Sequence, residues 1–192
     1  MQQSRRHYTV DDYLTLQKGA GIKLEYLDGE IWAMAGGTRA HERIAGNIFA
    51  FLHNKLRESG CEPFSGNMRV TTPSGLWTYP HISIVCGEAE VIGHDDETTL
   101  TNPVALVEVL SDSTRDYDRG EKFELYRSIP TLTHYLLIEQ RTAGVEHRWR
   151  NETGGWSSET KSSLYQSVTL ADLGVDLPLA RIYERVECPL EL

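Results

Sequence analysis

The sequence predicts a mixed α/β fold, in which one β-sheet carries helices against it. A predicted β-hairpin at 22–36 precedes the longest predicted helix, at 38–60. Two nearly continuous apolar runs, 103–111 and 132–140, lie on either side of a predicted helix at 118–128. Such runs are typical of buried parallel strands joined by a crossover. Neither GxGxxG nor GxxxxGK[ST] occurs, which argues against a nucleotide-binding loop.

Composition places the chain among globular proteins. Its 192 residues are 40% hydrophobic and 24% charged, which is enough for one domain over 1–192 with a hydrophobic core. The net charge of −9 argues mildly against broad binding to nucleic acid. A local basic patch at 141–150 is interpreted as a solvated strand edge.

The cysteines and the N-terminus suggest a compartment. Cys61, Cys86 and Cys188 are far apart, odd in number and form no CxxC pair. This argues against a disulfide framework or a structural zinc site and fits a reducing cytoplasm. No signal peptide or membrane span is legible, so we expect a cytoplasmic protein with no membrane partner.

Local signals define the first elements. Thr9 is the predicted N-cap of a short helix with acids in its first turn. Asp28-Gly29 is a strong turn signal for the hairpin. Thr38 can cap the long helix and Gly60 can end it. Its apolar residues recur at helical spacing: Ile44, Ile48, Phe51, Leu52 and Leu56.

The remaining elements follow from alternation and from turn residues. Strands are predicted over 61–72 and 75–87, an acidic loop containing His94 over 88–100, a closing hairpin over 144–151 and 154–162, and a short helix over 177–186. The helix between the apolar strands should end before Pro130.

A buried charge pair is the first candidate for a site. Glu108 interrupts an apolar strand and shares a face with Leu106 and Leu110 by alternation. Lys122 has apolar residues three, four and seven positions later, which puts it on the inward side of its helix. A buried carboxylate and a buried ammonium both need partners. The pair is either functional or a structural ion pair.

The histidines are individually weaker signals. His81 follows Pro80 and alternates with Trp77, Tyr79, Ser83 and Val85 on one predicted strand face; a strand histidine is more often structural than a ligand. His41 shares a helical face with apolar residues, and Glu42 is the alternative inward acid. Asp118 is interpreted as a helix cap.

Several stretches together resemble one family. They are "LEYLDGEIWAMAG", "HERIAGNI", "YPHISIVCGE", "TNPVALVEVLSDSTRDYDRGEKFELYRSIPTLTHYLLIEQ" and "LPLARIYERV". From Tyr8 to about Val186 the chain is similar to the Uma-type, restriction-endonuclease-like family of the PD-(D/E)XK nuclease superfamily. The resemblance implies a core of helix, three strands, helix and strand. This agrees with the order of elements predicted above, which adds an N-terminal β-hairpin and peripheral C-terminal strands to a mixed sheet flanked by helices.

The resemblance also implies a site. It assigns the superfamily glutamate to Glu108 and the lysine to Lys122, because Leu110 stands at the usual lysine position. The family pattern Tyr-Pro-Asp reads Tyr-Pro-His here, so His81 stands where the metal-binding aspartate is expected. His41 and Glu42 are accessory candidates. Two carboxylates would hold Mg²⁺ against the scissile phosphate, and the lysine would orient or help to deprotonate the attacking water.

The substitution leaves several functions open. Mg²⁺ prefers oxygen ligands, whereas imidazole suits Mn²⁺, Fe²⁺, Co²⁺, Ni²⁺ or Zn²⁺. The chain is therefore expected first to be a metal-dependent endonuclease, either weakened with Mg²⁺ or using a softer ion. The alternative is an inactive module that binds nucleic acid or a protein partner. DNA is the expected nucleic acid. A homodimer is compatible with cleavage of two strands.

Overall fold

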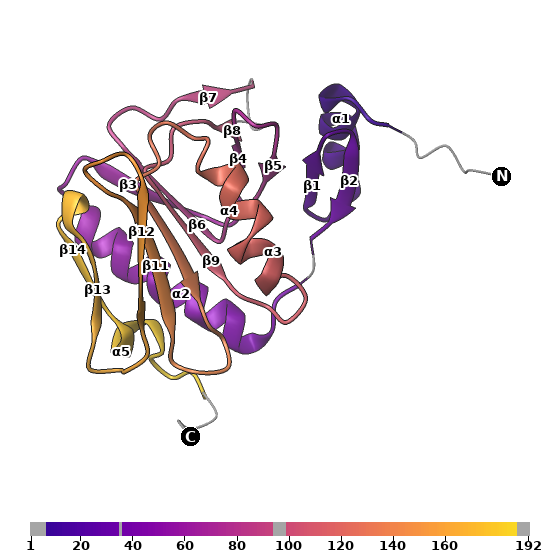
Figure 1. The fold of residues 1–192 in the computed structure, drawn as a ribbon. Helices are drawn as coiled ribbons and strands as arrows, with labels where there is room; N and C mark the ends of the chain where they lie inside the picture. Colours follow the sequence, from indigo (N-terminus) through magenta and orange to yellow (C-terminus); the bar gives the residue numbers. More distant parts are fainter. Residues whose placement is uncertain (1–6, 35, 94–98, 188–192) are drawn as a thin grey trace.

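The computed structural model describes residues 7–34, 36–93 and 99–187, and its centre is a six-stranded sheet (Figure 1). In spatial order the strands are β12 (Trp156–Lys161), β11 (Val145–Arg150), β10 (His134–Ile138), β9 (Ala105–Val109), β6 (Ile82–Cys86) and β3 (Cys61–Ser65). Only the β9–β10 pair in this sheet is parallel. The structure therefore confirms the predicted crossover. It also shows that the predicted closing hairpin, β11–β12, extends the central sheet.

Helices pack against both faces of this sheet. Helix α2 (Arg39–Leu56) lies on one face, and Thr38 caps it by accepting a hydrogen bond from His41 N. Helices α3 (Arg115–Arg119) and α4 (Glu121–Tyr126) connect β9 to β10 and lie on the other face (Figure 1). No helix in the described ranges is long and apolar enough to cross a membrane.

A second sheet stands beside the first and begins with the predicted hairpin. Its spatial order is β2 (Glu30–Ala33), β1 (Leu24–Leu27), β5 (Trp77–Thr78), β4 (Arg69–Thr71), β8 (Thr99–Leu100) and β7 (Val91–Ile92). Asp28 and Gly29 both have positive φ, as the tight turn between β1 and β2 requires. Helix α1 (Val10–Ala20) precedes the hairpin, and Thr9 caps it as predicted.

The C-terminal segment covers one face of the central sheet. It contains β13 (Ser167–Leu170), the 3₁₀ helix η2 (Ala171–Leu173), β14 (Val175–Pro178) and α5 (Leu179–Ile182). Its apolar residues join α2 and the alternate residues of the sheet in one hydrophobic core. A second core lies on the opposite face, between α4 and the sheet. Glu108 belongs to this second face, among the residues of that core.

Two predicted strands are each divided between the two sheets. The strand predicted over 61–72 becomes β3 and β4, with a turn at Gly66-Asn67. The strand predicted over 75–87 becomes β5 and β6, because Pro80 cannot donate a ladder hydrogen bond. The predicted alternation of His81 with Trp77 is therefore wrong: His81 lies in a bend directly before β6.

Smaller corrections concern loops. The helix predicted at 118–128 is two helices, because the chain breaks at Gly120, whose ψ of −99° is not helical. The loop predicted over 88–100 contains β7 and β8, which pair with each other. His94 lies outside the described residues.

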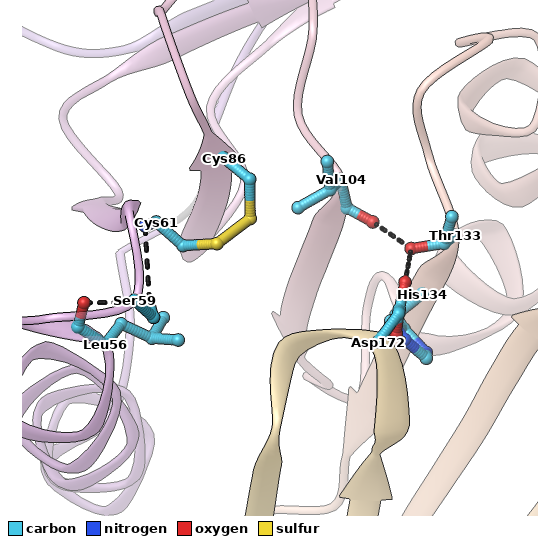
Figure 2. The surroundings of a disulfide bond; sticks show 8 residues. All are labelled: Leu56, Ser59, Cys61, Cys86, Val104, Thr133, His134 and Asp172. Carbon is cyan, nitrogen blue, oxygen red and sulfur yellow. Dashed lines mark hydrogen bonds and ion pairs between the residues drawn. A yellow bond between two sulfur atoms is a disulfide. The ribbon is translucent and has the colours of Figure 1, made fainter.

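The expectation about cysteines is wrong for one pair. Cys61 and Cys86 form a disulfide between directly opposed positions of β3 and β6 (Figure 2). Strand pairing brings together two cysteines that are 25 residues apart in the chain. Odd number and wide spacing are therefore poor guides, because register and not sequence distance decides which cysteines meet. Cys188 lies outside the described residues.

Candidate functional site

Glu108 and Lys122 meet in the interior, as the sequence predicts. Lys122 Nζ lies 3.0 Å from Glu108 Oε1, and both side chains are almost fully buried. Glu108 comes from β9, and Lys122 comes from the first turn of α4, on the crossover that follows. Tyr126, one turn further along α4, donates its hydroxyl hydrogen to the same oxygen at 2.8 Å. The crossover therefore fixes the pair from two sides.

Two further carboxylates surround Lys122. Glu25 Oε1 on β1 lies 3.0 Å from Lys122 Nζ, and Asp118 Oδ1 on α3 lies 3.6 Å from it. Trp32 Nε1 donates to Glu25 Oε2 at 2.8 Å, and the hydroxyl of Thr78 donates to Oε1. The sheet that carries the hairpin thus contributes a buried acid to the site.

The sequence interpretation missed Glu25 and misjudged Asp118. Glu25 alternates with Leu24 and Tyr26 and shares its face with Leu27, so an acid between apolar residues on both strand faces was an available signal. Asp118 does not cap α3 or α4: the N-cap positions of both helices lack a side-chain cap hydrogen bond. It is buried within α3, one helical turn before Lys122.

The second oxygen of Glu108 is taken by His81. The Nδ1 atom of His81 contacts Glu108 Oε2, so a protonated Nδ1 donates to the carboxylate. The other ring nitrogen, Nε2, lies 2.8 Å from Nε2 of His41, which reaches in from the first turn of α2. A chain of contacts thus runs from His41 through His81 to Glu108. Both histidines join the candidate site.

Glu42 does not join this cluster. Its side chain is 73% exposed and lies 3.5 Å from Nδ1 of His41, on the outer side of the histidine. The expectation that Glu42 is an inward acid is therefore wrong, and His41 is the inward residue of the two. The buried Nδ1 of His41 has no hydrogen-bond partner among the described residues.

Burial and neighbouring charges shift the pKa values of several groups in the cluster. Burial raises the pKa of Glu108, but the positive charge of Lys122 and the hydrogen bond from His81 outweigh it and bring the pKa to about 2. Burial and the charge of Glu108 raise the pKa of Asp118 to about 6. Burial lowers the pKa of Lys122, yet the three carboxylates raise it well above its usual value. One lysine side chain thus lies within 3.6 Å of three acidic side chains.

The site opens to solvent through two hollows. One of about 300 Å³ is lined by Glu25, Glu108 and Lys122, among others. The next, of about 540 Å³, extends along α2. His41 and His81 line both hollows, so the histidine pair stands between the buried carboxylates and the open surface.

The arrangement of carboxylate oxygens does not fit Mg²⁺. Both oxygens of Glu108 are engaged by protein groups: Lys122 and Tyr126 contact Oε1, and His81 contacts Oε2. Both oxygens of Glu25 are likewise engaged. In the part of the chain that the structure describes, no three His, Cys, Asp or Glu residues form a group that could hold a metal ion. The expected ligands His81 and Glu108 bind each other instead.

The fold and the buried Glu108–Lys122 pair at a parallel crossover define a restriction-endonuclease-like protein. The arrangement of helices on both faces of a mixed sheet is consistent with the same class of fold. The chain belongs to the Uma2 family, described as "Putative restriction endonuclease", whose family model matches residues 10–180. Restriction-endonuclease-like proteins generally use divalent metal ions.

The chain is also similar to two relatives and to a solved structure. The chain is 33% identical over 149 residues to the uncharacterized protein slr1290 of Synechocystis sp., covering 76% of both chains. It is 34% identical over 140 residues to the uncharacterized protein sll1609 of the same organism, covering 72% of this chain and 78% of the relative. A crystal structure of a "putative nuclease belonging to DUF820" from Anabaena variabilis superposes with a TM-score of 0.73 at 15% identity, covering 91% of this chain and 97% of the other. This similarity supports the fold.

Proposed function

We propose that residues 1–192 act as one nuclease-fold domain that binds DNA and whose cleavage centre is closed by His81. Membership of a family described as restriction endonucleases supports DNA as the ligand. The hollows that lead from the surface to Glu108 support a site within reach of a DNA strand.

The proposal that His81 closes the cleavage centre rests on one observation, the contact between Nδ1 of His81 and Oε2 of Glu108. A carboxylate oxygen that accepts a hydrogen bond from an imidazole is not free to bind a cation in the same direction. An aspartate at this position would instead add a second carboxylate beside Glu108. Two adjacent carboxylates repel each other, and a divalent cation relieves that repulsion.

Replacing His81 with the aspartate that the family pattern expects tests this proposal. DNA binding and cleavage would be measured for the wild-type protein and for His81→Asp, each with Mg²⁺, with Mn²⁺ and with EDTA. We expect the wild type to bind DNA equally well with and without metal and to leave it intact. His81→Asp should cleave DNA with Mg²⁺, and His81→Asp combined with Glu108→Gln should not.

Two results would contradict the proposal. Failure of the wild type to bind DNA in any condition would remove the binding function. Cleavage by the wild type that rises with Mg²⁺ and is lost in Glu108→Gln would show that the centre is open. Circular dichroism of each variant provides the control for folding.

A second candidate function is phosphodiester hydrolysis with a softer ion. The observation that favours it is the 2.8 Å approach of Nε2 of His41 to Nε2 of His81, beside the buried carboxyl group of Glu108. Two imidazole nitrogens suit Mn²⁺, Co²⁺, Ni²⁺ or Zn²⁺ better than Mg²⁺. Titration calorimetry with Mn²⁺ and Zn²⁺ separates the two candidates: binding that is lost in both His41→Ala and His81→Ala favours hydrolysis.

A further inference from the structure

Three arginines surround a hollow on the outer surface of α2, next to the candidate site. Arg39 and Arg43 are one helical turn apart near the start of the helix, and Arg185 follows α5. The hollow has a volume of about 530 Å³. Its lining consists of Arg39, Glu42, Arg43, Gly46, Asn47, Glu184 and Arg185. We call Arg39, Arg43 and Arg185 the arginine surface.

The arginine surface carries three guanidinium groups that no ion pair with the described residues holds. Within the described ranges, none of its members forms an ion pair. Of the two acids in the hollow, Glu184 pairs with Arg181 at 3.2 Å, whereas Glu42 is exposed and forms no ion pair with the three arginines in the described structure. A guanidinium without a protein partner is available to an anionic ligand, and phosphate suits its planar fork of donors.

The other basic patch differs in this respect. Arg148 pairs with Glu146 at 2.6 Å, and Arg150 donates to backbone carbonyl groups. Arg141 pairs with Asp112. That patch, over 141–150, therefore contacts other groups of the protein. Its interpretation as a strand edge is wrong, because β11 pairs with β10 on one side and with β12 on the other. Of these two basic regions, the arginine surface is the one whose guanidinium groups form no ion pair with the described residues.

The hollow at the arginine surface continues into the candidate site. It shares Glu42 and Gly46 with the hollow of about 540 Å³, which in turn reaches His41 and His81. Gly46 leaves the helix surface open at the junction: a Cβ atom built there would have no neighbour within 4 Å. A chain of phosphates could thus follow α2 from the arginines toward the histidine pair.

We propose that the arginine surface binds the phosphate backbone of DNA on the strand that leads to the His41–His81 hollow. This inference rests on the proposed function, since it names the part of the surface that holds the DNA. Negative charge on the strand complements the three guanidinium groups, in a protein whose net charge of −9 would otherwise repel DNA.

The first test removes the charges. Fluorescence anisotropy of a labelled DNA duplex, in EDTA over a series of KCl concentrations, would compare the wild type with the triple variant Arg39→Ala, Arg43→Ala and Arg185→Asn. Asparagine tolerates the positive φ of 57° at 185, and alanine favours the helix, so the fold should persist. We expect weaker binding, with the slope of log affinity against log salt reduced by roughly 2 to 3. The control, Arg141→Ala, should leave the slope unchanged.

The second test adds charge at the open junction. Gly46→Lys, Gly46→Gln and Gly46→Glu place side chains of different charge at one exposed helical position. We expect affinity for the duplex to fall in that order, while all three variants unfold no more easily than the wild type, since glycine is a poor helix former.

The outcomes separate the two proposals. If the wild type does not bind the duplex, the proposed function fails, and the arginine surface fails with it. If the wild type binds, but the triple variant keeps both its affinity and its salt slope, the arginine surface alone is refuted. Equal affinity across the Gly46 variants would refute the path along α2.

Discussion

Asp118 provides a test of whether the buried cluster costs the fold stability. Its side chain is only 4% exposed, and burial together with Glu108 raises its pKa from 3.8 to about 6. A difference of about 2 pKa units corresponds to about 3 kcal/mol between the two protonation states. The single ammonium of Lys122 already faces Glu25 and Glu108 at shorter distances, so it only partly offsets this cost.

The pH dependence of stability follows from the direction in which the pKa of Asp118 is shifted. Because the folded-state pKa lies above the unfolded value, the contribution of Asp118 to stability is fully present below about pH 3.8 and is lost as the pH rises through about 6. At pH 7 the ionised carboxylate therefore destabilises the fold. We expect Asp118→Asn to raise the free energy of unfolding by about 1 to 3 kcal/mol at pH 7 and to have little effect near pH 4.

Urea unfolding at the two pH values measures this difference. The matched control is Asp116→Asn, an exposed position in the same short helix, which should change stability by only a few tenths of a kcal/mol, roughly. A lower stability of Asp118→Asn than of the wild type at pH 7 would refute this prediction. That result would mean that the pair with Lys122 outweighs the burial of the charge.

Two further predictions concern regions outside the cluster. Replacing both Cys61 and Cys86 with alanine should lower the free energy of unfolding by about 3 kcal/mol, because the disulfide closes a loop with a separation of 25 residues. Guanidinium unfolding with and without reductant checks this, and reductant should not affect the double variant; an unchanged midpoint in the wild type would contradict it. Burial, with a contribution from His134, lowers the pKa of His147 from 6.5 to about 4. Stability from this neutral histidine is complete above about pH 6.5 and is lost as the pH falls toward 4, a loss of about 1 to 3 kcal/mol. In His147→Gln, the unfolding midpoint should change less with pH over this range. A variant whose midpoint depends on pH as strongly as that of the wild type would exclude His147 as the source of this dependence.

The predictions that held depend on local periodicity. Alternation placed Glu108 on the inner face of its strand, and helical spacing placed Lys122 opposite it. The Thr38 cap and the Asp28-Gly29 turn could be predicted because helix caps and tight turns depend on neighbouring residues in the chain. Together these signals gave the crossover and the buried pair at its centre.

The features that were missed depend on contacts between distant segments. Glu25 reaches Lys122 only because β1 pairs with β5, and no local pattern specifies that pairing. The meeting of Cys61 with Cys86 likewise depends on the register of β3 against β6. The break at Pro80 is different, since the residue type itself predicts it. The hairpin β13–β14 was also missed, although Gly174 with positive φ lies between its strands.

The disulfide has a consequence for how copies of this chain could exchange segments. Strand β3 is an outermost strand of the central sheet, and an edge strand is the segment that most easily detaches and joins a neighbouring molecule. A covalent bond to β6 ties β3 to its own sheet (Figure 2). While the bond is intact, β3 cannot leave for a second molecule without taking β6 with it. The oxidised protein is thus protected against domain swapping at this edge.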